Sequence, residues 1–301
     1  MTAHPADRAT EAFVAHRNLL FTVAYEVLGS AADAEDVLQE VWLRWAPVDH
    51  GEVRDARAYL VRMTTRQALN RLRAVRRRRE AYVGSWLPEP LLTTADAAED
   101  VELAESLSTA MMLVLETLSP TERAVFLLRD VFEVAYDEIA AAVDKTPAAV
   151  RQVAHRARQH VHARRPRDVA SADRTRAALD AFRRAVEDGD LQGLLDVLAP
   201  DVTFVADGGG RATAALRPVV GADRVARLVL GGLAKALDNG VRLTAEATVV
   251  NGGPALLLRS DDGLDGVLTA RVEGGRLVEL FYVRNPEKLS RLDHVTPLAL
   301  R

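Results

Sequence analysis

A break between two helical patterns near the middle of the chain constrains the fold most. The run 136–143 has apolar residues at helical spacing, including Ile139, Ala140 and Val143, before Asp144-Lys145 interrupts it. Thr146 then has the side chain of an N-cap, and Pro147 suits the first helical position, where its missing N–H costs nothing. A second helix follows over 147–165. Its apolar face is Val150, Val153, Ala154, Ala157 and Val161, and its polar face is Arg151, Gln152, His155, Arg156, Arg158 and Gln159.

No acid occurs from Lys145 to Arg165, so the polar face of this second helix is cationic. A short helix, a tight turn and a helix with a basic outer face together predict a helix-turn-helix that binds DNA. An ordinary helical hairpin with a solvated face is the alternative.

Two earlier helical segments carry opposite charge. The segment 57–79 contains nine arginines and no acid beside an apolar helical pattern, which is the pattern expected of a nucleic-acid backbone contact. A solvated arginine-rich face is the alternative.

The helix expected from Ala31 has Asp33, Glu35 and Asp36 in its first turns. These acids either complement the helix dipole or dock a partner. Three aromatic residues either stack on exposed bases or lie in the core, namely Trp42, Trp45 and Tyr59.

Length and composition limit the number of domains, the available chemistry and the cellular location that we expect. At 301 residues the chain has room for two or three domains, and without cysteine it has no disulfide or thiolate chemistry. It shows no signal-peptide pattern and no apolar run of membrane-spanning length, so we expect a cytoplasmic protein that does not contact a membrane. The net charge is −4, so a nucleic-acid surface must come from local segregation of charge.

A linker separates the first helices from the helix-turn-helix. The run Trp86-Leu87-Pro88-Glu89-Pro90 cannot continue a helix, because each proline lacks a donor and restricts the residue before it. Five acids follow without a base among them: Asp96, Glu99, Asp100, Glu102 and Glu105. Downstream, Ser119-Pro120-Thr121-Glu122 predicts a capping box that opens a helix over 123–130.

The C-terminal half changes from helices to strands. Helices are expected over 174–186, 191–198 and 223–237, and strands over 201–205, 241–250, 255–259, 266–272 and 276–284, the last pair joined by a turn at 273–275. This order predicts an α+β domain whose curved sheet wraps around helices and leaves a cavity at one end. Asp201, Asp207 and Tyr282 are candidates for an acid–base pair, although Asp207 beside three glycines is more simply a turn former.

Residues 10 to 165 resemble an extracytoplasmic-function sigma factor, the promoter-specificity subunit of bacterial RNA polymerase. The run from Asp33 to Trp42 resembles the region 2 helix that docks on the polymerase clamp. Arg57-Ala58-Tyr59-Leu60 through Asn70-Arg71-Leu72-Arg73 resembles the part that melts and binds the −10 element. Leu118 to Arg123 and Tyr136 to Ala140 resemble the opening of a region 4 that reads the −35 element.

The resemblance implies roles for particular residues. For the −35 element they are Arg151, Gln152, His155 and Arg156. For the −10 element and its backbone they are Tyr59, Arg62, Arg66, Asn70, Arg71 and Arg73. For polymerase docking they are Asp33, Glu35, Asp36, Gln39, Glu40 and Trp42. The implied partners are promoter DNA and core RNA polymerase, through its β′ clamp and β flap.

The C-terminal half resembles a SnoaL-like domain, the fold shared with ketosteroid isomerases and polyketide cyclases. Three motifs carry this resemblance: Trp86 to Pro90, Asp207-Gly208-Gly209-Gly210-Arg211, and Asn285-Pro286-Glu287-Lys288-Leu289, in which Glu287 stands where Asp is more usual. The resemblance implies a fused regulatory domain in place of a separate anti-sigma protein. The expected regulatory contacts are Trp86, Pro88, Asp207, Gly208, Gly209, Arg211, Asn285, Pro286 and Lys288.

The predicted fold is therefore multidomain: two all-α sigma domains (a region 2 helical bundle and a region 4 helix-turn-helix), then an α+β SnoaL-like cone with a curved sheet. The expected boundaries are 10–82, a linker 83–105, 106–165, a linker 166–173, 174–290 and a tail 291–301. We expect no enzyme activity, no metal and no cofactor. The sequence leaves undecided whether a small-molecule ligand binds in the cavity. The alternatives are a ligand-sensing one-component regulator, and an isomerase or cyclase fused to DNA-binding helices.

Overall fold

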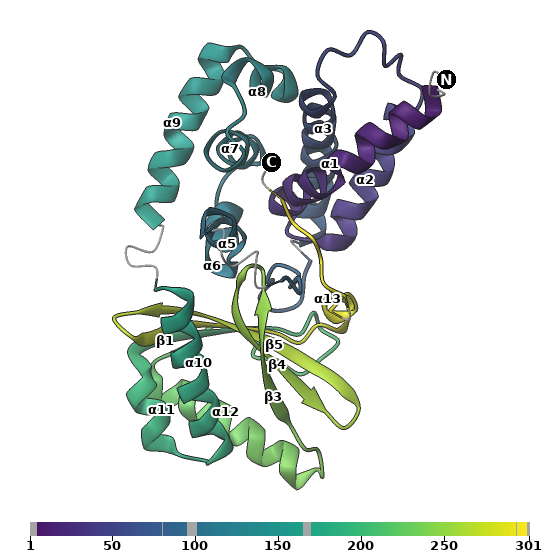
Figure 1. Cartoon of the computed structure of the whole chain (residues 1–301). Coiled ribbons are helices and arrows are strands. Elements are labelled where there is room, and N and C mark those ends of the chain that lie inside the picture. Colours follow the sequence, from purple (N-terminus) through teal and green to yellow (C-terminus); the bar gives the residue numbers. More distant parts are fainter. Residues whose placement is uncertain (1–4, 80, 95–100, 165–169, 293, 300–301) are drawn as a thin grey trace. The chain divides into compact units, whose positions relative to one another are not determined.

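The computed structural model describes residues 5–79, 81–94, 101–164, 170–292 and 294–299 (Figure 1). The chain forms two compact units. The first unit contains Met1–Glu80, Met111–Arg165 and Pro297–Arg301, and the second contains Ala81–Ala110 and Pro166–Thr296. Asp96, Glu99 and Asp100 of the expected acidic run, and 166–169 of the second expected linker, lie outside the described residues.

Three long helices begin the first unit: α1 (Pro5–Leu28), α2 (Ala31–Trp45) and α3 (Ala56–Arg79). Gly29 ends α1 with a φ of 69°, and the Ser30 side chain then caps α2 by accepting a hydrogen bond from Asp33 N at 3.2 Å. Trp45 lies in the core, where its Nε1–H donates to Ala9 O at 2.9 Å. Trp45 is therefore a packing residue, and base stacking by its indole is excluded in this structure.

The helix-turn-helix lies further along the first unit. It is preceded by α6 (Thr109–Glu116), α7 (Pro120–Phe126) and a π-helical turn η1 (Leu127–Val131), and it consists of α8 (Tyr136–Val143) and α9 (Pro147–Arg164). The predicted capping box is confirmed, because Ser119 Oγ accepts from Glu122 N while Glu122 Oε2 accepts from Ser119 N. The helix expected over 123–130 is instead split, since the backbone widens into η1 after Phe126.

The predicted break between the two helices is also confirmed. Asp144 adopts a left-handed φ of 52° after α8, and Thr146 Oγ1 accepts a hydrogen bond from Ala149 N at 3.2 Å to start α9. The expected inner face of α9 is buried in full. On α8 the burial differs slightly, because Ala142 is buried while Val143 is only half-buried.

The second unit is an α+β domain. Its helices are α5 (Val101–Leu107), α10 (Ala172–Glu187), α11 (Leu191–Val197), α12 (Ala222–Asp238) and α13 (Pro286–Leu289). Its strands are β1 (Leu198–Asp207), β2 (Val219–Val220), β3 (Thr244–Val250), β4 (Gly253–Ser260), β5 (Gly263–Glu273) and β6 (Arg276–Val283). The predicted fold class, helical domains followed by an α+β curved-sheet domain, is confirmed.

The sheet has the order β2-β1-β6-β5-β4-β3. The chain order alone does not show that β1 pairs with the last strand, β6, in parallel, with Phe204 opposite Leu280. The remaining neighbours are antiparallel, and the predicted turn at Gly274-Gly275 joins β5 to β6. One face of the sheet packs on the helices through a buried core that includes Leu179 and Phe182 of α10 with Leu256, Leu268 and Leu280 of the strands.

The opposite face of the sheet is buried as well. Leu257, Val267 and Phe281 alternate with the core residues and are nonetheless hidden from solvent. The Thr109 hydroxyl meets the Thr269 hydroxyl of this face at 3.1 Å, and Leu107 beside it is fully buried. Ala81–Ala110 is therefore grouped with the sheet, whereas the sequence boundaries treated 83–105 as a separate linker and began the next domain at 106. Within the described residues, no helix combines the length and apolar character needed to cross a bilayer.

The capping box of α7 gives a stability prediction. Replacing Ser119 by Ala removes the acceptor for Glu122 N and should lower the free energy of unfolding of the first unit by about 1 kcal/mol. Thermal or urea denaturation would measure this change. Thr121→Ala, in the same helical turn but outside the cap, is the matched control and should change stability much less.

Candidate functional site

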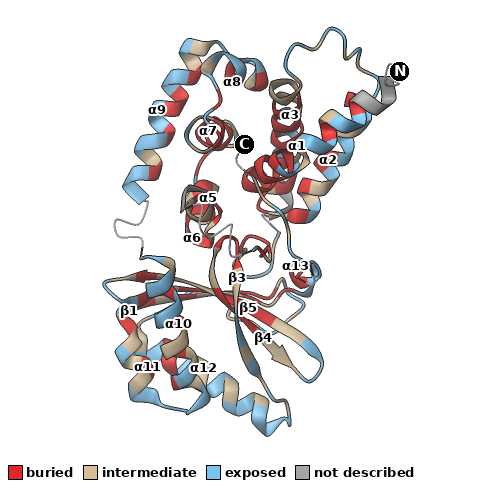
Figure 2. Cartoon of the chain, in the orientation of Figure 1, coloured by how far each residue is buried: buried red, intermediate tan, exposed pale blue. Residues whose placement is uncertain are grey.

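The outer face of α9 carries all four predicted −35 residues. Arg151, Gln152, His155 and Arg156 are exposed along one side of the helix, which Figure 2 shows in pale blue opposite its buried side. Arg158 is instead paired within the protein, because its Nε donates to Asp130 Oδ1 of η1 at 2.6 Å. Guanidinium and amide groups in such a row can donate to base edges in the major groove.

Tyr136 supports this face from α8. Its ring lies 5.5 Å from the Arg151 guanidinium and 4.8 Å from that of Arg129. These cation–π contacts orient Arg151 without using its hydrogen-bond donors. The donors of Arg151 therefore stay available to a ligand beyond the helix.

The predicted −10 residues are distributed along α3 and differ in their surroundings. Asn70 and Arg73 are exposed and bonded to each other, with Arg73 NH1 donating to Asn70 Oδ1 at 3.0 Å. Arg66 instead donates to the backbone of α8, and Arg71 binds acids of α2. Tyr59 and Arg62 lie together, with the Arg62 guanidinium 4.9 Å from the Tyr59 ring centroid. The side chains of Arg77 and Arg78 lie outside the described part of the chain.

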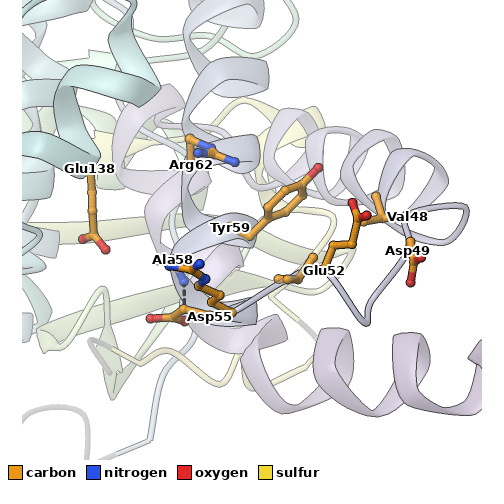
Figure 3. Close-up of a pocket in the computed structure, with 10 residues that line it drawn as sticks. Val48, Asp49, Glu52, Asp55, Ala58, Tyr59, Arg62 and Glu138 are labelled. Carbon is orange, nitrogen blue, oxygen red and sulfur yellow. Dashed lines mark hydrogen bonds between the residues drawn. The ribbon is translucent and has the colours of Figure 1, made fainter.

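A cavity of about 460 Å³ opens beside Tyr59 (Figure 3). The loop before α3 contributes Asp49, Glu52 and Asp55 to its lining, α3 contributes Tyr59 and Arg62, and α8 contributes Glu138. Behind the cavity, the Tyr59 ring lies 5.5 Å from that of the buried Trp45. The cavity thus combines one half-buried aromatic face with several acceptors and two cationic donors, Arg54 and Arg62.

The acids predicted to dock polymerase fall into two groups. Asp33 Oδ1 accepts from Arg71 Nε at 2.7 Å, Asp36 Oδ2 accepts from Arg71 NH2 at 2.5 Å, and Glu35 is paired with Arg17 at 2.9 Å. Gln39 and Glu40 are exposed, while Trp42 is half-buried with its ring edge against Phe13. The structure therefore joins two sets that the sequence treated separately, because Arg71 of the DNA set holds α3 to the acidic start of α2.

Asp207 is the centre of a polar cluster in the second unit. Its carboxylate is fully buried at the end of β1. Oδ1 accepts from the Tyr82 hydroxyl at 2.6 Å and from Gly209 N at 3.0 Å, while Oδ2 accepts from Leu87 N at 2.8 Å and from Lys288 Nζ at 2.6 Å. Asp207 does cap the glycine turn as expected, but two of the four hydrogen bonds to its carboxylate hold the segment 82–87.

Lys288 closes this cluster from α13. Its ammonium also donates to Leu87 O at 2.5 Å and lies 4.4 Å from the Trp86 ring centroid and 5.0 Å from that of Tyr82. Burial and the hydrogen bond to Asp207 raise the pKa of Tyr82 above its ordinary value, so its hydroxyl stays protonated and acts as a donor.

The other motif residues support the same cluster. Asn285 Nδ2 donates to Tyr82 Oη at 2.9 Å, and Asn285 Oδ1 caps α13, in which Pro286 is the first residue. A side chain at Gly209, whose φ is 59°, would collide with the Asn285 amide, and one at Gly208 would collide with Ala212 O. Pro88 is buried, and Arg211 forms an exposed ion pair with Glu287 at 2.6 Å. The three motifs therefore meet in one place.

A second attachment point was not predicted. Asn251, in the turn between β3 and β4, accepts from Leu91 N at 2.8 Å and donates its own N–H to Leu91 O at 2.9 Å. Thr93 N donates to Val249 O at 3.1 Å, and Leu92 bridges Val250 in antiparallel fashion. On its other side, Leu92 O accepts from Thr296 N at 2.8 Å. Residues 91–93 are thus joined to the end of β3 and to the β3–β4 turn by an isolated antiparallel bridge and its neighbouring hydrogen bonds.

The sequence held only weak signals for these additional residues. Tyr82 stood at the end of the segment assigned to the first helical domain, and Asn251-Gly252 reads simply as a turn between strands. Hydrogen bonding across more than a hundred residues of chain leaves no local pattern, so only the tertiary structure reveals the pairings with Asp207 and Leu91.

The candidate acid–base residues are not brought together. Tyr282 donates to Asp265 Oδ2 at 2.5 Å, its pKa is raised by burial and by that carboxylate, and Arg284 binds the same Asp265. Asp207 is committed to the 82–87 segment, and Asp201 is exposed. A hollow of about 160 Å³ lies between α10 and β3–β4, lined by Leu179, Val249 and other residues. Among the described residues, no cluster of His, Asp and Glu could hold a metal.

Comparison with known proteins agrees with this arrangement. Residues 12–79 match the family described as Sigma-70 region 2, and residues 108–161 match the family described as Sigma-70, region 4. The ECF RNA polymerase sigma factor SigJ of Mycobacterium tuberculosis is 38% identical over 289 residues, which cover 92% of this chain and 92% of that protein. The probable ECF sigma factor SigI of the same species is 31% identical, covering 95% of this chain and 96% of SigI.

A solved structure extends the similarity to the whole fold. The crystal structure of the M. tuberculosis extracytoplasmic function sigma factor SigJ superposes with a TM-score of 0.74 at 34% identity. The superposition covers 94% of this chain and 99% of the SigJ chain, so it includes the C-terminal α+β domain as well as the helices. The resemblance drawn from the sequence motifs is confirmed.

The buried carboxylate gives a second prediction. Asp207→Asn leaves the Lys288 ammonium without its buried counter-charge, and breaking such a pair typically costs about 3–5 kcal/mol. We expect faster amide hydrogen exchange over 82–94 and a lower melting temperature of the second unit. Asp201→Asn, on the same strand but exposed, is the matched control. Unchanged exchange over 82–94 in Asp207→Asn would show that the carboxylate does not hold this segment.

Proposed function

We propose a division of roles within this chain, which belongs to the extracytoplasmic-function family of RNA polymerase sigma factors. As a sigma factor it directs core RNA polymerase to promoter DNA. The proposal assigns the −35 element to α9, through Arg151, Gln152, His155 and Arg156. It is supported by the exposure of all four side chains on one face and by the absence of acids on that helix.

Region 2 reads the −10 element with α3 and the cavity beside it. Tyr59 offers an aromatic face to an unstacked base, and Arg62 can donate to its edge or to a phosphate. Asn70 and Arg73 are placed for backbone contact, as is Arg66 once its contacts with α8 are released. Arg71 has a positioning role instead, because its guanidinium is neutralised by Asp33 and Asp36.

We assign polymerase docking to the exposed side of α2. Gln39 and Glu40 face solvent, and Trp42 presents part of its ring. Asp36 keeps about half of its side chain exposed despite its pairing, whereas Asp33 and Glu35 serve mainly to hold α2 against α3 and α1. The β′ clamp of the polymerase is the partner proposed for this surface, and the β flap is the partner proposed for region 4.

The C-terminal domain controls the factor by holding the segment that joins region 2 to region 4. One observation carries this proposal: residues 81–94 are attached to the domain at two separate points, Asp207 and Asn251. Promoter elements lie at a fixed spacing, so a domain that restrains the connecting segment biases which separations of the two regions are populated. This restraint stands in for a separate anti-sigma protein, whose absence stays a prediction.

A role for the C-terminal domain as an enzyme has little support from the residues. Tyr282 and Asp207 are bound to different partners, and their hydrogen bonds fix structure. Control by protein contact is therefore favoured over catalysis. A ligand-sensing role is the second candidate, supported only by the small hollow between α10 and the sheet.

The −35 assignment can be tested by base substitution. Arg151→Ala and Arg156→Ala should each weaken binding to the cognate −35 sequence by about 1–3 kcal/mol, because each removes a base-edge contact. Affinities for cognate and scrambled −35 DNA would be measured with the holoenzyme at fixed salt. Arg164→Ala, on the same helix beyond these residues, is the control. An equal loss on both DNAs would mean that the arginines contact phosphates instead.

The control proposal can be tested by run-off transcription. Promoter-specific transcripts should require both this chain and core polymerase, and failure to bind core polymerase would contradict the sigma factor role. Asn251→Ala should change transcript yield relative to the full natural chain, because it removes the side-chain acceptor of Leu91 N and weakens the attachment of residues 91–93 to the β3–β4 turn. Asn239→Ala, in an exposed turn of the same domain, is the control. Equal yields from the natural chain and Asn251→Ala would show that this attachment has no regulatory role.

A further inference from the structure

Two arginines of the first unit converge on one carboxylate. Glu116, the last residue of α6, accepts from Arg79 NH1 at 2.6 Å and is also paired with Arg123 of α7. The Arg123 side chain is fully buried, and that of Glu116 is only 19% exposed. Burial would raise the pKa of Glu116, but Arg123 and Arg79 together hold it below its ordinary value, so the carboxylate is charged at neutral pH.

Arg123 and Arg79 also bind helix ends, Arg123 across the boundary between region 2 and region 4 and Arg79 within region 2. Arg123 of region 4 donates to Glu26 O near the end of α1 through Nε at 3.0 Å and NH2 at 2.7 Å, and Arg79 NH2 donates to Leu28 O at 2.6 Å. In the opposite direction, Arg76 of region 2 donates to Glu116 O at 3.2 Å and to Leu118 O. Cations at helix C-termini are favoured because the last carbonyls there lack intrahelical partners.

The middle of α3 is held in a similar way. Arg66 NH2 donates to Ala141 O at 2.9 Å, Arg66 Nε donates to Ala142 O at 3.4 Å, and the guanidinium pairs with Asp144 at the end of α8. Nearby, Glu138 of α8 lines the cavity that also contains Tyr59 and Arg62. Region 4 therefore lies along the part of α3 that carries the residues assigned to the −10 element.

We propose that Glu116 is a clasp that closes region 4 over the −10 surface of region 2. In the closed form Arg66 is bound to α8, and Glu138 adds a negative charge to the lining of the cavity that would receive a base. Promoter binding requires the clasp to open, because region 4 must leave α3 before Arg66 and the cavity can meet DNA. This inference rests on the proposed −10 assignment of Tyr59, Arg62 and Arg66.

The clasp acts separately from the Asp207 cluster, because its residues belong to the first unit and the cluster belongs to the second. The clasp also changes the role that we assign to two arginines of the segment 57–79, which the sequence alone assigned to nucleic-acid contact. Arg76 and Arg79 are bound to helix ends and to Glu116 in the closed form, so they stabilise this form and do not contribute to a solvated basic face.

The distance between regions 2 and 4 tests the clasp directly. The natural chain has no cysteine, so Leu43→Cys on α2 and Gln159→Cys on α9, both at exposed positions, label the full chain specifically. Single-molecule energy transfer between dyes at these sites reports closure without polymerase or DNA. Glu116→Gln keeps the shape of the side chain but removes the charge that balances Arg79 and Arg123. We expect a several-fold lower ratio of closed to open molecules.

Asp137→Asn, which removes an exposed charge from α8, is the matched control and should leave the ratio unchanged. If Glu116→Gln lowers helix content by circular dichroism, Arg66→Gln in the middle of α3 provides the same distance measurement with an exposed residue. A ratio unchanged in both variants, with helix content intact, would overturn the clasp.

A second measurement separates the clasp from the −10 assignment. Glu116→Gln should bind a single-stranded −10 oligonucleotide several-fold more tightly than the natural chain does. Open molecules with unchanged oligonucleotide affinity would contradict occlusion of the −10 surface by region 4. Amide exchange over 82–94 should stay as in the natural chain, and an increase there would assign the opening to release of the linker instead.

Discussion

The buried carboxylate of Asp207 is the interaction on which the arrangement of the second unit depends. It accepts hydrogen bonds from a tyrosine, two backbone amides and a lysine, and all of these donors except Gly209 N come from parts of the chain distant from β1. A buried charge is costly unless it is paired and hydrogen-bonded, so the four donors must assemble together or the carboxylate is destabilising. That requirement makes the attachment of residues 82–87 specific, and the apolar residues Leu87 and Leu91 add buried surface to it.

The first unit uses charge in the same way at a different place. Glu116 gathers arginines from α3 and α7, and carbonyl groups at the ends of α1, α6 and α8 accept the remaining donors. Arginine suits this task because its planar fork of five donors can satisfy a carboxylate and a helix end at once. Some of the arginines that would bind phosphate in an open molecule therefore hold regions 2 and 4 together in the closed one. Closure and DNA binding compete for the same side chains.

Local sequence patterns predicted most of the secondary structure, for identifiable reasons. The capping box at Ser119, the break at Asp144 and the N-cap at Thr146 depend on neighbouring residues only, and the apolar face of α9 follows from helical spacing. Strand ends were less accurate, since β1 begins at Leu198 and β3 at Thr244, and the short β2 was missed. The parallel pairing of β1 with β6 joins strands about seventy residues apart, which no local pattern encodes.

The sequence by itself determined that this chain has a cationic helix-turn-helix, an arginine-rich helix and an α+β domain, and its motifs identified the family. The tertiary structure decided which charges are available. Arg71 and Arg158 belong to basic faces in the sequence, yet each is paired with an acid in the fold, and Asp207 changed from a turn former into the centre of a cluster. The physical reason is that charge and periodicity are properties of single segments, whereas pairing and burial depend on distances between segments far apart in the chain.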